Sequence, residues 1–149
     1  MNSPRSLIVR GNRVSVNAGF YDTNVLIAFL FAEKDRIDIA KKVIRKHLVK
    51  AFSIISIHEL YFFSVKYGVE ERFKQIKEYI EQIFKVEHLT QEICLEAARL
   101  RREYRLPEVD SLILATATIN NYAYFYSFDE DFKELDNERI RNTTIYYLR

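Results

Sequence analysis

Short apolar segments alternate along this chain with longer segments of helical periodicity, and this alternation limits the possible folds more than any other feature. The apolar segments are predicted to be strands, at residues 18–21, 51–55, 86–89, 122–127 and 143–148. The segments between them are predicted to be helices, at residues 24–31, 35–50, 56–67, 70–84, 90–105 and 109–121. Strands that alternate with helices in this way form a mainly parallel sheet with helices on both faces. The predicted fold class is α/β.

Glycine and proline are scarce, which favours short connections and excludes two classes of nucleotide-binding protein. The chain has three glycines and two prolines, about 3% of its residues where about 12% is usual. The glycines are Gly11, Gly19 and Gly68. They cannot form a GxGxxG fingerprint or a Walker A loop, so dinucleotide and P-loop nucleotide binding are excluded.

The length of 149 residues fits one compact domain, predicted at residues 18–149. Residues 1–17 are polar and form a separate N-terminal extension, in which Pro4 and Gly11 suggest a turn and a short extra strand. The lone cysteine, Cys94, has no second cysteine to form an internal disulfide with. A reducing compartment is therefore expected, and the predicted location is the cytoplasm.

The charge and hydropathy of the chain limit its partners. The net charge is only +2, so any binding to nucleic acid needs a local basic face rather than a high overall charge. The longest apolar run, residues 25–32, has eight residues, whereas a membrane span needs roughly 20. Residues 7–9 are too short for the apolar core of a signal peptide. We therefore expect no membrane association.

Acidic residues recur where predicted strands end and the following helices begin. They are Asp22, Glu59, Asp110, Asp129 and Asp131. In an open α/β sheet, ligands bind beyond the carboxyl ends of the strands. Carboxylates brought together there repel one another unless a cation holds them, and hard oxygen ligands of this kind suit Mg²⁺ or Mn²⁺.

Each acid also has an explanation that involves no ligand. Ser56 and Glu59 match a capping box, in which the glutamate bonds to the backbone amide of the serine. Asp110 would complement the dipole of its helix, and Asp22 and Asp129 would act as N-caps or turn residues. These explanations do not account for the nearly apolar segment that follows Asp110. That segment predicts a buried helix with one acid at its mouth.

Four short motifs that contain these acids resemble the four acidic motifs of PIN domains. They are Tyr-Asp22-Thr-Asn-Val-Leu-Ile-Ala, Ser-Ile-His-Glu59-Leu, Val-Asp110-Ser-Leu-Ile-Leu-Ala-Thr-Ala and Ser-Phe-Asp129-Glu-Asp131-Phe. The motifs occur in the order of the family and cover most of residues 18–148. The short single-domain layout is most similar to VapC-type toxins of toxin–antitoxin pairs. The chain departs from the family at Ser127, where threonine is common, at Ser111, where alanine is common, and in its longer N-terminus.

The resemblance implies a three-layer α/β/α sandwich and a metal-dependent endoribonuclease, together with a small antitoxin protein as partner. Carried over by motif, Asp22, Glu59, Asp110 and Asp129 would bind Mg²⁺ or Mn²⁺, with Asp131 as a candidate fifth acid. The metal ions would polarise the phosphate of an RNA substrate and stabilise the leaving oxygen. The alternative is a non-catalytic PIN-like module that binds RNA or protein and whose acids are only structural caps.

Two further groups of side chains are candidates for contacts with partners. One is a set of arginines shortly before Asp110, which would either bind RNA phosphates or form a solvated face; it consists of Arg99, Arg101, Arg102 and Arg105. The other is Tyr61, Phe62 and Phe63, which are consecutive on one predicted helix and cannot all face the same core. These rings predict a homodimer interface.

Other catalytic classes do not fit the sequence. His58 and Glu59 do not continue into HExxH, because Phe62 stands at the second histidine position. Cys94 and the three histidines lack the spacing of a zinc site. A phosphoacceptor receiver domain needs an acidic pair after its first strand, and Asp22 has no acidic neighbour.

Overall fold

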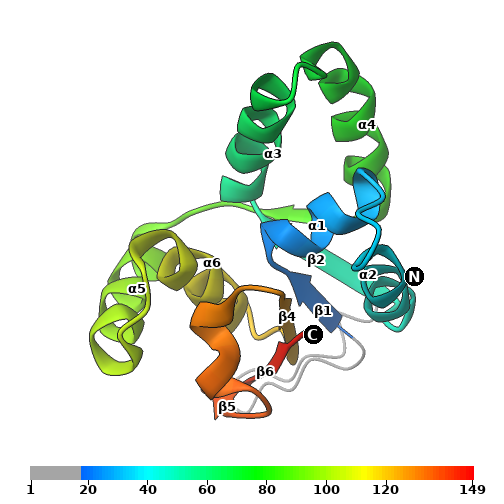
Figure 1. The fold of residues 1–149 in the computed structure, drawn as a ribbon. Coiled ribbons are helices and arrows are strands. Elements are labelled where there is room, and N and C mark those ends of the chain that lie inside the picture. Colours follow the sequence, from blue (N-terminus) through cyan, green and yellow to red (C-terminus); the bar gives the residue numbers. More distant parts are fainter. Residues whose placement is uncertain (1–17) are drawn as a thin grey trace, which may run out of the picture.

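The computed structural model describes residues 18–149, and within this range the strands form one six-stranded sheet (Figure 1). The strands are β1 (Ala18–Tyr21), β2 (Val49–Ser53), β3 (Lys85–Glu87), β4 (Tyr124–Ser127), β5 (Arg139–Ile140) and β6 (Thr143–Tyr147). Their order across the sheet is β3-β2-β1-β4-β6-β5. Every neighbouring pair is parallel except β5 with β6. The predicted mainly parallel sheet is confirmed.

Helices cover both faces of this sheet (Figure 1). They are α1 (Thr23–Leu30), α2 (Ile37–Arg45), α3 (Ile55–Lys66), α4 (Phe73–Ile83), α5 (Gln91–Tyr104) and α6 (Glu108–Ile119), with short 3₁₀ helices η2 (Glu70–Arg72) and η3 (Glu130–Leu135). One apolar core lies between the sheet and α5, α6 and η3. A second core lies between the other face and α1 to α4. The α/β/α sandwich predicted from the motifs is confirmed.

The two central strands supply side chains to both cores because successive residues of a strand point to opposite faces. Phe20 of β1 stacks on Phe125 of β4, with 6.1 Å between ring centroids, in the core beside α5 and α6. Tyr21 and Tyr126, the next residues along, stack at 5.5 Å in the core on the opposite face. Both strands are therefore buried on both faces, as parallel strands in such a sheet must be.

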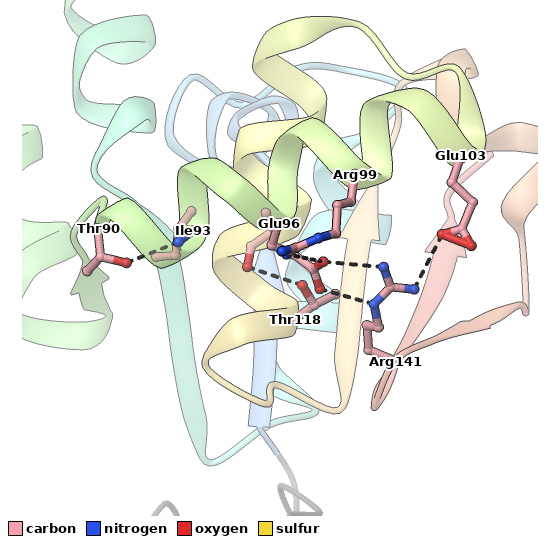
Figure 2. A network of polar contacts seen from close by, with 8 residues as sticks. Thr90, Ile93, Glu96, Arg99, Glu103, Thr118 and Arg141 are labelled. Carbon is pink, nitrogen blue, oxygen red and sulfur yellow. Dashed lines mark hydrogen bonds and ion pairs between the residues drawn. The ribbon is translucent and has the colours of Figure 1, made fainter.

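An ion-pair network fixes the turn between β5 and β6 against α5 (Figure 2). The Arg141 guanidinium donates to both carboxylate oxygens of buried Glu96, at 3.1 and 3.2 Å. It also donates to Glu103, about two turns further along the same face of α5, at 3.4 Å. The same helix begins at Thr90, whose hydroxyl accepts from the backbone N–H of Ile93 at 3.1 Å, as its predicted N-cap.

The largest difference from the predicted elements lies between residues 35 and 55. The helix predicted at 35–50 ends at Arg45, and β2 begins at Val49 instead of residue 51. Leu48, which continued the helical periodicity, is 74% exposed in the connection. The register of β1 with β2 pairs Ala18 with Val49, so hydrogen bonding to the neighbouring strand overrides the local helical pattern.

Helices α3 and α4 form a hairpin that extends away from the sheet (top of Figure 1). Helix α3 begins two residues after the carboxyl end of β2, and α6 begins near the same edge. These two helix starts, with the ends of β1 and β4, surround the candidate site. The predicted N-terminal extension at residues 1–17 lies outside the described residues. In the described part of the chain, no helix has the length and apolar character of a membrane span.

Candidate metal centre

Asp22 lies at the centre of the site, directly after β1. It is the N-cap of α1, and its Oδ1 accepts a hydrogen bond of 2.8 Å from the backbone N–H of Thr23. Its Oδ2 accepts from the Ser127 hydroxyl at 2.6 Å. The side chain is buried, so the two hydrogen bonds hold a carboxylate in one orientation inside the protein.

Asn24 links the ends of the two central strands. Its side-chain amide donates to Ser127 Oγ at 3.3 Å and lies 3.4 Å from Asp22 Oδ2, while its Oδ1 accepts from the backbone N–H of Phe128 at 3.0 Å. Ser127 Oγ in turn accepts from the backbone N–H of Asp129 at 2.9 Å. This network fixes the loop after β4 relative to β1, and with it the position of Asp129.

Three aspartates from different segments converge at this edge of the sheet. Asp22, Asp110 and Asp129 each offer a carboxylate oxygen, and the three oxygens lie within 4.8 Å of one another. Asp110 is in the first turn of α6, and Asp129 is the N-cap of η3, where its Oδ1 accepts from the backbone N–H of Asp131 at 2.9 Å. The explanations as caps and dipole partners therefore hold locally, and the same side chains also form a cluster.

Glu59 lies on α3 at the border of this cluster. Its Oε1 accepts from the Thr23 hydroxyl at 2.5 Å, and Thr23 Oγ1 is also 2.7 Å from Ser56 Oγ. The capping-box explanation is wrong, because the N-cap of α3 is Ile54 and has no side-chain hydrogen bond. Glu59 is instead connected to the Asp22 segment through the hydroxyl of Thr23.

The environment raises the pKa of two of the aspartates. Burial is the largest cause for Asp22, whose pKa rises to about 6 despite hydrogen bonds from Ser127 and Thr23 that lower it. The pKa of Asp110 rises to about 8, first because of burial, then because of the charges of Asp22, Asp129 and Asp131 and a hydrogen bond with Asp131. Carboxylates gathered in this way favour protons or a cation as counter-charge.

The four predicted acids border one cavity of about 450 Å³. Asp22, Asp110 and Asp129 line it together with Glu59 of α3. Helix α3 supplies much of the remaining wall, with His58, Phe62, Phe63, Lys66 and Tyr67. The cavity lining therefore combines acidic side chains with aromatic side chains and one lysine.

The predicted RNA-binding arginines do not line this cavity. Arg99 lies 4.0 Å from Glu96, and Arg101 pairs with Glu108 at the start of α6, at 3.2 Å. Arg101, Arg102 and Arg105 surround a separate shallow hollow on α5. Their connection to the acids is indirect, since Glu108 stands two residues before Asp110 on the same helix.

Several residues of the site were not predicted from the sequence. Thr23 and Asn24 stand inside the first motif, directly after Asp22 at the start of a helix. These positions could have indicated that their side chains belong to the site. In the sequence, Ser127 stands out only as a departure from the family pattern, although its hydroxyl donates to Asp22. Lys66 had no such signal, because it reaches the cavity only through the direction of α3.

Comparison with known proteins identifies the family. A model of the PIN domain matches residues 20–138. The chain belongs to the PIN-domain family. Among curated proteins, this PIN domain is similar to Ribonuclease VapC2 of Methanocaldococcus jannaschii, with 27% identity over 142 residues that cover 86% of this chain and 95% of the relative.

Solved structures with the same fold come from toxin–antitoxin complexes. One, a toxin–antitoxin complex from Klebsiella pneumoniae, is 28% identical to this PIN domain with a TM-score of 0.63, covering 76% of this chain and 89% of that one. VapBC2 from Rickettsia felis, bound to a DNA fragment from its promoter, is 15% identical with a TM-score of 0.65, covering 89% and 99%. VapBC-5 from Mycobacterium tuberculosis is 20% identical with a TM-score of 0.61, covering 89% and 100%. At these lower identities the last two show the fold alone.

Proposed function

We propose that this PIN domain is a Mg²⁺- or Mn²⁺-dependent endoribonuclease and the toxin of a toxin–antitoxin pair. The observation that carries the proposal is the cluster of three aspartate oxygens within 4.8 Å of one another at the carboxyl end of the sheet. The similarity to a VapC ribonuclease over nearly its whole length supports RNA as the substrate. Similarity to a toxin–antitoxin complex supports an antitoxin partner.

The residues of the cluster fit a hard divalent cation. Asp22, Asp110 and Asp129 offer only carboxylate oxygens, which are the ligands that Mg²⁺ and Mn²⁺ prefer. The raised pKa of Asp110 indicates negative charge that no nearby cationic side chain balances in this part of the protein. When bound, the cation supplies Lewis-acid stabilisation of the charge that develops on the phosphate.

The protein's own residues orient this site. Ser127 and the Thr23 backbone fix the carboxylate of Asp22, and the Thr23 hydroxyl fixes that of Glu59. Either Asp110 or Glu59 accepts the proton of the attacking water, because both line the cavity where the phosphate would lie. In-line attack on phosphorus breaks its bond to the 3′ oxygen and leaves a 5′-phosphate on the product. Asp131, hydrogen-bonded with Asp110, is the candidate fifth acid.

The experiment that tests this function is an RNA cleavage assay with pure protein, titrated with Mg²⁺ and Mn²⁺. Wild type should cleave RNA only with a divalent cation, EDTA should stop the reaction, and Asp110→Asn should lose at least about 100-fold of the rate. Products should carry a 5′-phosphate and a 3′-hydroxyl. RNA binding with no cleavage under any metal would instead support the non-catalytic PIN-like module.

The remaining parts of the proposal concern partners and organisation. The arginine hollow on α5 is proposed to bind RNA phosphates beyond the cavity, because three arginines line it. The exposed ring of Tyr61 on α3 is proposed to contact a homodimer partner. Residues 18–149 are proposed as the single domain and residues 1–17 as an extension, and the site of action is proposed to be the cytoplasm, where the RNA is.

A further inference from the structure

Helix α3 supplies an aromatic part of the cavity lining, and the same helix carries Glu59. Phe62 and Lys66 are four residues apart, as are Phe63 and Tyr67, so each pair lies one helical turn apart on the same side of the helix. All four line the cavity together with Glu59. The acidic cluster and the aromatic surface therefore belong to one continuous space.

Two of these rings, Phe62 and Tyr67, are open to solvent, and the third ring, Phe63, packs against Tyr67. Phe62 is 63% exposed and Tyr67 is 58% exposed. Phe63 is packed from two sides, with ring centroids 4.7 Å from Phe31 and 4.6 Å from Tyr67. Tyr67 is thus supported from behind by a ring that is itself anchored to the end of α1. An exposed aromatic side chain with rigid support is suited to bind a flat partner.

Lys66 adds a positive charge to the same surface. Its ammonium lies 5.4 Å from the centroid of the Tyr67 ring. Among the residues described as lining the cavity, it is the one lysine or arginine, and it forms no ion pair with another described residue. A lysine beside aromatic rings and an acidic, metal-binding cluster suits a phosphate group. That phosphate would be the neighbour of the one held at the cluster.

We propose that Phe62, Lys66 and Tyr67 form a nucleotide subsite next to the scissile phosphate. An unpaired base of the substrate stacks on the exposed rings, and the phosphate beside that base pairs with Lys66. The inference rests on the proposed ribonuclease function and adds which side chains hold the neighbouring nucleotide. Stacking requires a base that is free of its own duplex, so the preferred substrate has an unpaired nucleotide next to the cleaved bond.

The occupant is a nucleotide rather than a protein segment because of charge and continuity. A basic peptide would be repelled by the Lys66 ammonium, and a purely apolar segment would offer that ammonium no anion. A nucleotide fits both the aromatic rings and the Lys66 ammonium, since its base is flat and its phosphate is anionic. Loss of one base–ring stack typically costs about 5- to 150-fold in affinity.

The test uses a short single-stranded RNA with one mapped cleavage site and a set of copies that each lack one base. In wild type, removing the base that stacks should lower kcat/KM about 5- to 150-fold, at one position beside the cleaved bond. In the Phe62→Ala/Tyr67→Ala double variant, kcat/KM for intact RNA should fall by the same factor of about 5 to 150. Removal of the base should then have no further effect. Phe62→Tyr, which keeps a ring, should keep the effect of base removal.

Matched controls separate this role from a structural one. Tyr79→Ala removes an exposed ring from α4, outside the cavity, and should leave every substrate unchanged. Lys66→Met should reduce the slope of log affinity against log salt concentration by about 0.7, the value for one phosphate contact on a single strand. Melting curves and sedimentation should show that all variants fold and keep the oligomeric state of wild type.

Three outcomes would overturn the inference. The first is a base-removal effect of the same size in wild type and the double variant. The second is equal loss on all substrates together with a changed oligomeric state, which would make a second copy of the chain the occupant. The third is equal fluorescence quenching in wild type and double variant when 2-aminopurine replaces the stacking base in the same RNA. If wild type cleaves no RNA but quenching still depends on the two rings, the ribonuclease function fails while the subsite stands.

Discussion

The carboxylate charge of Asp110 is unfavourable in the metal-free protein. Burial and the carboxylates of Asp22, Asp129 and Asp131 raise its pKa to about 8. Asparagine keeps the size of the side chain and removes the charge. We therefore expect metal-free Asp110→Asn to be as stable as wild type or slightly more stable, although a favourable helix-dipole interaction, usually below about 1 kcal/mol, is lost. Thermal melts in EDTA measure the difference, and a clear loss of stability would favour a purely structural role.

Magnesium should separate the same two proteins. A ligand that binds only the folded state raises its melting temperature, by an amount that depends on concentration and affinity. Wild type should therefore melt higher when Mg²⁺ is added, and Asp110→Asn should shift much less, because one carboxylate ligand is gone. Equal shifts in both proteins would exclude Asp110 as a ligand and remove the centre of the metal site. Titration with NaCl at matched ionic strength is the control for unspecific ion effects.

The raised pKa values also predict how stability changes with pH. An unfolded chain releases the proton of an aspartate near pH 4, whereas folded Asp22 and Asp110 keep theirs up to about pH 6 and about pH 8. The folded state thus binds more protons in this range, so the free energy of unfolding in EDTA should fall as pH rises from about 4 to about 8. Asp110→Asn should flatten the decline between about pH 6 and 8. Urea midpoints at several pH values test this, and parallel curves for the two proteins would refute it.

The acidic residues of the site could be found in the sequence because each one lies beside a strand end or a helix start. Sheet geometry then brings such positions together without any knowledge of side-chain contacts. The hydrogen bond from Thr23 to Glu59 joins residues 36 positions apart, and no local pattern predicts it. The same holds for Lys66, which reaches the cavity because of the direction in which α3 leaves the sheet.

At the scale of elements, hydrophobic periodicity predicted which segments are helices and strands, whereas strand pairing in the sheet decided where some of them end. Helix α5 begins where Thr90 predicts, because a cap is a local interaction. The end of α2 was wrong, because Val49 and Lys50 pair with β1 in the folded sheet. The two-residue strand β5 and the 3₁₀ helix η3 were not predicted, since each is too short to show a repeat of its own. Their positions depend on contacts with β6.

The turn between β5 and β6 depends on Arg141, which offers an element-scale prediction. Arg141→Met leaves the buried carboxylate of Glu96 with only the more distant Arg99, at 4.0 Å. We expect a loss of about 1–3 kcal/mol in the free energy of unfolding, toward the lower end because Arg141 is partly exposed. Arg139→Met on the same turn, which removes an exposed contact with Asn142, should change stability by less than about 0.5 kcal/mol.

A second substitution tests the cause of that loss. Glu96→Gln removes the charge that Arg141 balances, so adding it to Arg141→Met should recover part of the lost stability. Urea denaturation of the two single variants and the double variant gives the coupling energy. Additive effects would show that Arg141 stabilises the turn by packing rather than by its charge.

At the scale of the whole molecule, the acidic site lies where the two layers of helices meet. Asp22 caps α1 and Glu59 belongs to α3, both helices on one face of the sheet, whereas Asp110 belongs to α6 on the other. Asp129 follows the central strand between them. A cation held by these side chains would connect both layers at one edge. Its effect on stability should therefore be global, with one cooperative transition that moves as a whole.

The second whole-molecule feature is the side of α3 that does not line the cavity, and it predicts a homodimer. Tyr61 and Val65 are four residues apart, do not line the cavity and are each 46% exposed. Closed two-fold dimers are the commonest assembly for a chain of this kind, and covering these side chains would remove apolar surface from water.

Sedimentation at micromolar concentration should show a dimer. Val65→Asp should convert it to a monomer, while Leu95→Asp, at an exposed apolar position on α5, should leave the dimer intact. A wild type that remains monomeric at this concentration would refute the prediction, and a Val65→Asp monomer that still melts higher with Mg²⁺ would show that the metal site is complete in one chain.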